Sequence, residues 1–285
     1  MALTKTQLFE QGLKLVIEAL RNIEKRADFH ADIQLLRRIQ QLKEPAKVQV
    51  SPASPESQRT TTISEPREKV EFDAPRRSPG DREQLEKLRL AIANCAKCPH
   101  LAASRHTVVF GTGNPEADLM FVGEAPGADE DMQGEPFVGR AGELLTKIIH
   151  TMGFRRSDVF IANVLKCRPD MPAGAPGNRP PTPEEMATCL PYLQRQIELI
   201  RPKVMVALGS VAMRGLFGKT EPMRLMRGKW HTFGSIPVMA TYHPSYLLRN
   251  QAMSEKRRVW EDMLLVLERL EIPVSEKQRN YFLTR

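Results

Sequence analysis

The stretch Leu119-Met-Phe-Val-Gly-Glu-Ala-Pro-Gly127 decides the fold class, because a short apolar run passes directly into glycine, an acidic residue and proline. A run of this kind, bounded by turn residues, is typical of a strand buried on both faces of a parallel sheet. Three later runs repeat the pattern, at Val159–Ala162, Val204–Leu208 and Val238–Tyr242. The sequence therefore predicts four buried strands.

Helical stretches separate these runs, at Ala141–Met152, Thr182–Ile200 and Ser210–Phe217. An alternation of strands and helices favours the α/β class, here a three-layer α/β/α sandwich around a central, mainly parallel, four-stranded sheet. In such sheets ligands gather at the carboxyl ends of the strands. We therefore expect the functional site among the residues that follow each run.

Upstream of this region the composition changes twice. Within residues 1–43, apolar side chains recur at helical spacing from Gln7 to about Arg26, and Ile33, Leu36 and Ile39 favour a second short helix. Residues 44–80 contain six prolines and few large apolar side chains, which predicts a flexible, disordered linker. The expected domains are a helical appendage at 1–43, a linker at 44–80 and a catalytic domain at 81–285.

The charge of the chain favours a polyanionic partner. Its 285 residues carry 42 Lys and Arg against 34 Asp and Glu, a net charge of +8, and most of the excess lies in residues 81–285. No apolar run is long enough to span a membrane, and the first residues lack the apolar core of a signal peptide. We expect a cytoplasmic protein with no membrane partner, in a compartment that keeps thiols reduced.

Polar side chains follow three of the predicted strands. Glu124 comes after the first, Asn163 after the second and His243 after the last, while Phe137 lies in a loop beyond Glu124. An aromatic ring can stack on a planar heterocycle, an amide can pair with an edge that bears adjacent carbonyl and N–H groups, and an imidazole can donate to a carbonyl oxygen. Uracil has such an edge, although an amide free to rotate would also accept cytosine.

The four cysteines are placed unevenly, as Cys95-Ala-Lys-Cys98 followed by Cys167 and Cys189. A reducing compartment makes two disulfides an unsuitable use of them, which leaves a metal or iron–sulfur centre. Four thiolates suit a structural zinc ion as well as they suit an iron–sulfur cluster. The residues alone leave these two alternatives open.

Four motifs together resemble the family 4 uracil-DNA glycosylases, the iron–sulfur type of bacteria and archaea. They are Gly123–Gly127, Pro136–Gly139, Asn163 with Lys166-Cys-Arg-Pro169, and His243–Arg249, and the resemblance extends from about Cys95 to Glu268. The resemblance implies a monofunctional enzyme that hydrolyses the N-glycosidic bond of deoxyuridine in DNA. It releases uracil and leaves an abasic site, after the nucleotide has left the base stack.

The resemblance also implies a role for each residue of the base pocket. His243 donates to uracil O2, Asn163 pairs with the O4 and N3 edge, and Phe137 stacks on the ring. Backbone groups of Gly123, Glu124 and Ala125 complete the pocket. Glu124 and Asp131 are the candidate carboxylates for positioning water or stabilising the sugar cation; the wider superfamily has Asp where this chain has Ala125, which leaves that assignment open.

For the cysteines, the resemblance implies that Cys95, Cys98, Cys167 and Cys189 bind a [4Fe-4S] cluster, which clamps loops near the DNA and takes no part in redox turnover. Basic residues at predicted loops supply contacts to phosphates. The candidates are Arg168, Arg179, Arg227, Lys229 and Arg249. Leu247 or Leu248 is the candidate wedge that fills the space left by the flipped base.

The expected partner is uracil-containing DNA, single- or double-stranded, bound by a monomer, with a protein partner on the N-terminal appendage. One alternative is a broader glycosylase for deaminated bases such as hypoxanthine and xanthine. Another is a non-catalytic iron–sulfur protein that binds nucleic acid. The presence of Glu124, Asn163 and His243 together counts against the second alternative.

Overall fold

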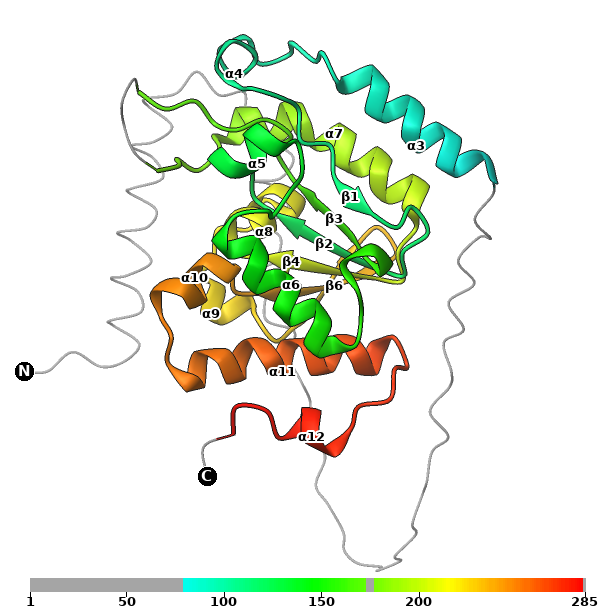
Figure 1. Ribbon diagram of the computed structural model, residues 1–285, viewed down its shortest axis with the longest axis vertical. Coiled ribbons are helices and arrows are strands. Elements are labelled where there is room, and N and C mark those ends of the chain that lie inside the picture. The colour runs from blue at the N-terminus through cyan, green and yellow to red at the C-terminus, as the bar shows by residue number, and fades with distance from the viewer. Residues whose placement is uncertain (1–78, 173–176, 284–285) are drawn as a thin grey trace, which may run out of the picture. The chain divides into compact units, whose positions relative to one another are not determined.

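A computed structural model of the chain describes residues 79–172 and 177–283, and it contains a six-stranded sheet in the order β1-β3-β2-β4-β6-β5 (Figure 1). The strands are β1 (Thr112–Gly113), β2 (Leu119–Gly123), β3 (Phe160–Asn163), β4 (Val204–Leu208), β5 (Trp230–Phe233) and β6 (Ile236–Thr241). The inner four, β3, β2, β4 and β6, are parallel. The predicted α/β class and parallel core are therefore confirmed.

The two outer strands, β1 and β5, were not predicted, and both are antiparallel to their neighbours. Strand β1 has only two residues, too few for a detectable alternation. Strand β5 is half exposed and joins β6 through a two-residue turn in which Gly234 has a φ of 60°. Such a hairpin places β5 at the edge of the sheet, where a strand does not need a buried apolar run.

Ten helices among the described residues surround the sheet. Their bounds are α3 (Pro79–Ile92), α4 (Pro99–Ser104), α5 (Ala128–Gln133), α6 (Arg140–Met152), α7 (Pro183–Ile200), α8 (Ser210–Phe217), α9 (Met223–Met226), α10 (Pro244–Arg249), α11 (Met253–Arg269) and α12 (Glu276–Arg279), with a 3-10 turn at Arg156–Asp158. The three helices expected from the sequence correspond to α6, α7 and α8. Helix α7 begins as its sequence predicts, with Thr182 as the N-cap and Glu185 completing a capping box.

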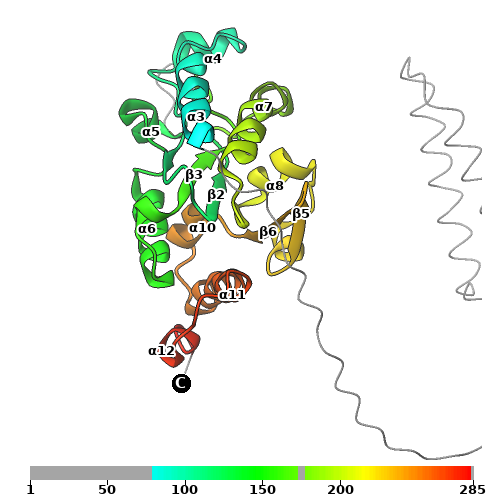
Figure 2. The same cartoon turned by 90° about the vertical axis from the view of Figure 1, so that its right-hand side faces the viewer.

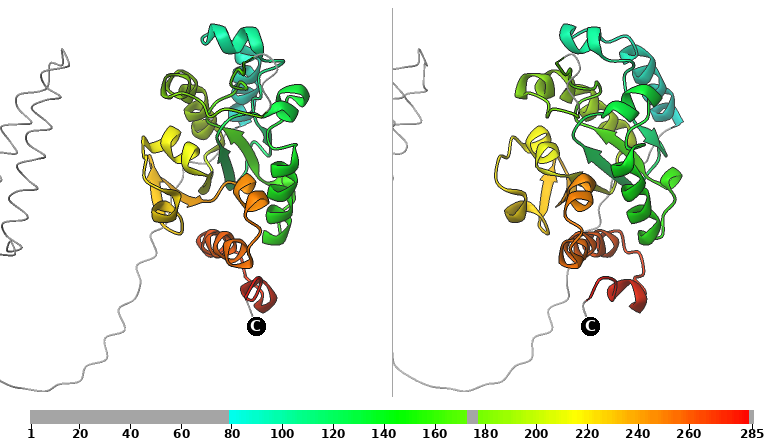
Figure 3. Two further views of the ribbon diagram at one scale, coloured as in Figure 1. Left: turned by 90° about the vertical axis from the view of Figure 1, so that its left-hand side faces the viewer. Right: turned by 60° about the vertical axis from the view of Figure 1, so that its left-hand side comes forward.

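Helices cover both faces of the sheet, which gives the three layers. In β2, Met120 and Val122 point into the core shared with α7 and α8, whereas Leu119 and Phe121 point into the core shared with α6 and α11. Figure 2 shows α7 and α8 on one side of the strands and α6 on the other. Helix α10 lies beside α6 in both views of Figure 3, so the segment after β6 returns to the end of the sheet where β2 also ends.

The two expected helices in residues 1–43, and all but the last two residues of the expected linker at 44–80, lie outside the described residues. Helix α3 begins at Pro79 and packs against α7, close to the boundary expected for the folded domain. Among the residues described, no helix has the length and apolar character that a membrane crossing requires.

Candidate active site

A cavity of about 700 Å³ opens at the carboxyl ends of the parallel strands. It is lined by residues that directly follow or end β2, β3 and β6, together with the loop after α5. Five of the predicted pocket residues line this cavity: Glu124, Ala125, Phe137, Asn163 and His243. The parallel topology thus brings into one cavity the side chains that the sequence places up to 119 positions apart.

Asn163 ends β3 directly opposite Gly123, the last residue of β2. Only 2% of Asn163 is exposed, and among the described residues its side-chain Oδ1 has no hydrogen-bond partner. A Cβ at Gly123 would lie 2.3 Å from that Oδ1 atom and 2.5 Å from Phe137 Cζ. Glycine is therefore required at position 123, because Asn163 and Phe137 occupy the space where a side chain would begin.

Phe137 is held in an unusual backbone conformation, with a φ of 56°, and only 6% of it is exposed. Glu130 fixes the loop that follows, because its carboxylate accepts hydrogen bonds from the Val138 N–H at 3.1 Å and the Gly139 N–H at 3.2 Å. The other oxygen accepts from the Gly127 N–H at 3.0 Å. One half-buried carboxylate thus joins the loop after β2 to the loop that presents the aromatic ring.

His243 is the N-cap of α10, and its ring centroid lies 5.5 Å from that of Phe137. Its Nδ1 accepts the Ser245 backbone N–H at 3.1 Å and lies 2.8 Å from the Ser245 hydroxyl. Burial, together with the charge of Arg249, lowers the pKa of His243 to about 4. At neutral pH the imidazole is therefore neutral, and because Nδ1 is an acceptor, the ring proton is on Nε2.

The two candidate carboxylates lie in different places. Glu124 lines the cavity, where burial raises its pKa and the charge of Arg214 opposes that rise. Asp131 does not line the cavity; its carboxylate accepts hydrogen bonds from the backbone N–H groups of His106, at 2.9 and 3.0 Å, and of Thr107, at 3.3 Å. Asp131 therefore anchors the loop before β1, and Glu124 is the carboxylate that can face a substrate.

A sequence profile described as the uracil DNA glycosylase superfamily matches residues 110–264, which contain every cavity residue described above. This chain belongs to the uracil-DNA glycosylase superfamily. The type-4 uracil-DNA glycosylase of Thermotoga maritima is 46% identical over 185 residues, which cover 64% of this chain and 92% of that protein. The type-4 uracil-DNA glycosylase of Archaeoglobus fulgidus is 43% identical over 182 residues, which cover 61% of this chain and 88% of that protein.

A type-5 uracil-DNA glycosylase from Pyrobaculum aerophilum is also similar, at 32% identity over 189 residues, which cover 55% of this chain and 80% of that protein. The similarity is greater to the type-4 proteins. It confirms the family that the motifs predict.

The superfamily pocket has a second wall that the sequence analysis did not assign to the base site. It contains Asn178, Arg179 and Pro180 together with Tyr242 and Tyr246. The two tyrosine rings stack with centroids 4.5 Å apart. Asn178 lies in a loop and has no strand or helix periodicity around it. The one sequence signal near it is the capping box of Thr182 and Glu185, which begins four residues later.

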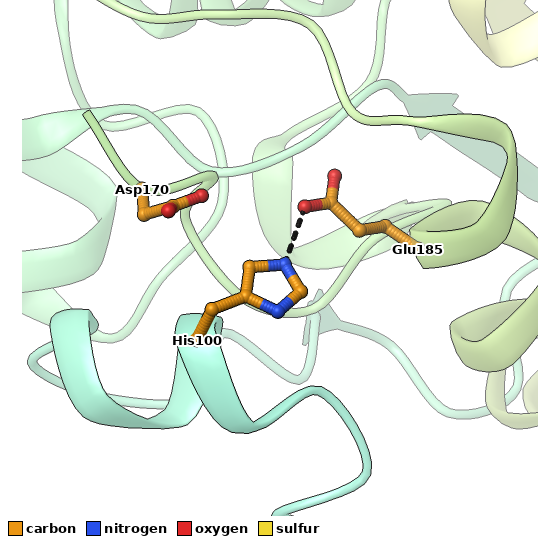
Figure 4. Close-up of side chains that lie close together, drawn as sticks. All are labelled: His100, Asp170 and Glu185. Atoms are coloured by element: carbon orange, nitrogen blue, oxygen red, sulfur yellow. Dashed lines mark hydrogen bonds and ion pairs between the residues drawn. The ribbon is translucent and has the colours of Figure 1, made fainter. Parts of the chain in front are cut away.

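Arg179 lies at the centre of a polar network with Asp170, Glu185 and His100, and Figure 4 shows the last three side chains. Its guanidinium binds Asp170 and both oxygens of Glu185, at 2.6 and 2.9 Å, and His100 Nε2 lies 2.8 Å from Glu185. The hydrogen bonds from Arg179 are the main reason why the pKa of Glu185 falls to about 2. His100, Asp170 and Glu185 lie close enough to hold a cation, but the Arg179 guanidinium already binds oxygens of both carboxylates.

The predicted DNA-contacting residues are dispersed. Arg249 lines the cavity, whereas Lys229 is exposed elsewhere and Arg227 forms an ion pair with the buried Asp262. Arg168 donates to the Gly177 carbonyl at 3.2 Å. Leu247 and Leu248 line a separate apolar groove of about 270 Å³ next to α10.

The four cysteines converge from three segments. Cys167 and Cys189 are buried together with Leu101 and Leu165, and Cys98 packs against that cluster. Burial raises the pKa of Cys167, and the Arg105 guanidinium beside it opposes that rise. Two N–H groups point at the sulfurs, from Arg105 to Cys167 and from the Lys166 backbone to Cys189, both at 3.2 Å.

Proposed function

We propose that this protein is a uracil-DNA glycosylase that hydrolyses the N-glycosidic bond of deoxyuridine in DNA, releasing uracil and leaving an abasic site. The observation that carries the proposal is the single cavity in which Phe137, Asn163 and His243 face a common space. The names of the type-4 relatives support the same reaction. Excision of uracil from DNA is a repair reaction, the first step of base excision repair.

The pocket residues divide the recognition of the base between them. The flipped base stacks on Phe137, while Asn163 offers Oδ1 to the N3–H of uracil and its amide N–H to O4. The unpartnered Oδ1 supports this role, because a buried acceptor without a partner in the free protein gains one when uracil enters. Packing against Gly123 fixes the amide, which favours uracil over cytosine. Backbone groups of Gly123, Glu124 and Ala125 complete the pocket.

His243 and Glu124 act on opposite partners of the breaking bond. Cleavage leaves negative charge on uracil and positive charge on the sugar, so a neutral imidazole that donates from Nε2 to O2 stabilises the leaving base. Glu124, on the same wall, stabilises the sugar cation or orients the attacking water. Asp131 has no part in this step, since its oxygens are held by backbone N–H groups.

We further propose that Cys95, Cys98, Cys167 and Cys189 bind a [4Fe-4S] cluster. A tetrahedral zinc site needs sulfurs about 3.8 Å apart, from Zn–S bonds of about 2.3 Å. Among the described residues, the only set of three or more potential ligands within 4.8 Å of one another is that of His100, Asp170 and Glu185, so no three cysteine sulfurs are that close. The N–H groups aimed at the sulfurs of Cys167 and Cys189 suit a cluster, which would join the cysteine-bearing segments.

The cluster assignment predicts the metal content of the purified protein. We expect brown protein with iron and acid-labile sulfide at about four of each per chain. Cys189→Ser should lose most of both and should melt at a lower temperature, because Cys189 is buried beside Cys167. Colourless protein with one zinc ion per chain would reverse the assignment.

DNA contacts, assembly and compartment are also proposals. Arg249, at the cavity, is placed to meet the phosphate of the flipped nucleotide, and Arg168, Arg227, Lys229 and Leu248 remain candidates for contacts farther along the strand. Binding should then weaken as salt rises. We propose a monomer that acts in the prokaryotic cytoplasm, as its relatives come from bacteria and archaea. The protein partner proposed for the N-terminal appendage concerns residues outside the described range.

An excision assay tests the function directly. The protein is incubated with oligonucleotides that carry one uracil, in single strands or opposite guanine or adenine, and abasic sites are cleaved with alkali. We expect a shortened strand from uracil substrates and none from a matched thymine control. Hypoxanthine and xanthine substrates in the same panel measure the breadth of the pocket. Absence of product from every uracil substrate would overturn the proposed function, and absence of product from the whole panel would leave the non-catalytic alternative.

A further inference from the structure

Lys166 is a fully buried lysine for which the proposed reaction has no use. Only 1% of the residue is exposed, and no ion pair within the described part of the chain reaches it. Its Nζ donates instead to two neutral oxygens, the backbone carbonyl of Asn163 at 2.8 Å and Gln196 Oε1 at 2.6 Å. Burying an ammonium group against carbonyl oxygens alone is costly, so its retention calls for a specific role.

The Asn163 carbonyl needs a partner because the sheet ends there. Asn163 forms the last pair with Gly123, and the next two N–H groups, of Val164 and Leu165, turn back to the Gly123 and Glu124 carbonyls. Lys166 Nζ is the donor that reaches the Asn163 carbonyl. The side chain proposed to pair with uracil, that of Asn163, therefore belongs to a residue whose backbone carbonyl is held by the Lys166 ammonium.

The second oxygen that Lys166 contacts, Gln196 Oε1, links the Lys166–Asn163 hydrogen bond to helix α7. Gln196 on α7 is fully buried, and its Nε2 donates to the Phe110 carbonyl at 2.9 Å. The Lys166 backbone N–H points at Cys189 Sγ, also on α7. Lys166 thus joins the end of β3 to α7 through its side chain and through its main chain.

We propose that Lys166 is a positioning residue that holds Asn163 in register with the edge of uracil and so sets the affinity of the pocket for the base. This inference rests on the proposed function, which gives Asn163 the role of pairing with the edge of uracil. It requires that removing the ammonium weakens the binding of uracil itself, whether or not the domain stays stable.

Lys166→Met removes the donor while keeping a side chain of similar length. We expect the inhibition constant of free uracil to rise about tenfold, and the rate of uracil release from DNA to fall by a similar factor. Because an inhibition constant does not depend on the fraction of active enzyme, partial unfolding alone would leave it unchanged. Iron content should stay at the wild-type level, since the main-chain contact to Cys189 is kept.

Two further variants keep the test decisive. In Lys166→Met the buried Gln196 Oε1 loses its hydrogen-bond donor. The double variant Lys166→Met with Gln196→Met removes that unpaired oxygen, so it can be measured if the single variant fails to fold. Leu193→Ala, in the buried face of α7, should lower the melting temperature and leave the inhibition constant unchanged. Unchanged uracil inhibition in a folded Lys166 variant overturns the inference. Failure of the wild-type protein to release uracil overturns the proposed function instead.

Discussion

Replacement of His243 by alanine is expected to lower the rate constant of uracil release about 10²- to 10³-fold, the usual effect of removing one donor from a developing anion. The dissociation constant for uracil-containing DNA should change by less than about threefold, because the hydrogen bond strengthens only as charge develops on O2. Single-turnover rates and fluorescence-anisotropy binding measure the two quantities separately. Equal losses in both would contradict the role given to His243.

The pH dependence of the same variant tests the protonation state. The wild-type imidazole is neutral above its pKa of about 4, so the ratio of wild-type to variant rates should stay constant from pH 8 down to about pH 5. A ratio that rises towards low pH would show that the imidazolium is the active form. His150→Ala serves as a control, since this exposed histidine in the last turn of α6 lies outside the cavity.

Sequence reasoning was sufficient where the chemistry follows the ends of parallel strands. Glu124, Asn163 and His243 each follow an apolar run, and parallel topology alone requires that such positions meet at one edge of the sheet. Phe137 was found through its motif, but its φ of 56° and the three N–H groups bound by Glu130 belong to tertiary structure and leave no periodic trace.

Charged residues were harder to place, because a sequence does not show which partner a charge has. Asp131 and Glu124 are equivalent candidates in the sequence. In the structure the Asp131 carboxylate accepts hydrogen bonds from backbone N–H groups, whereas Glu124 lines the cavity. Arg227 is a candidate for phosphate contact in the sequence, and the structure adds an ion pair with Asp262, with Nη2 2.5 Å from Oδ1, that the sequence does not reveal. Lys166 stands inside a motif in the sequence, but its contact with Asn163 depends on how the chain turns after β3.

Gly123→Ala is the substitution expected to damage the pocket most without removing a functional group. The added methyl would lie 2.3 Å from Asn163 Oδ1 and 2.6 Å from Phe137 Cε2, well inside normal contact distance. Since Asn163 pairs with Gly123 in the sheet, its main chain cannot retreat, and the amide and the ring must shift instead. Displacements of about 1 Å at a reacting centre cost about 100-fold in rate. We expect at least that loss in single-turnover uracil release.

Overpacking at Gly123 should also lower the free energy of unfolding by about 1–3 kcal/mol, so the loss of activity must be separated from the loss of stability. Gly218→Ala provides the match: this residue caps α8 with a φ of 66°, and an added Cβ meets no atom within 4 Å. Its cost of about 1 kcal/mol comes from the left-handed backbone alone, with no effect on the pocket. If both variants lost activity equally, stability would be the cause; if only Gly123→Ala lost it, the close contact of Gly123 with Asn163 and Phe137 is what gives the pocket its shape.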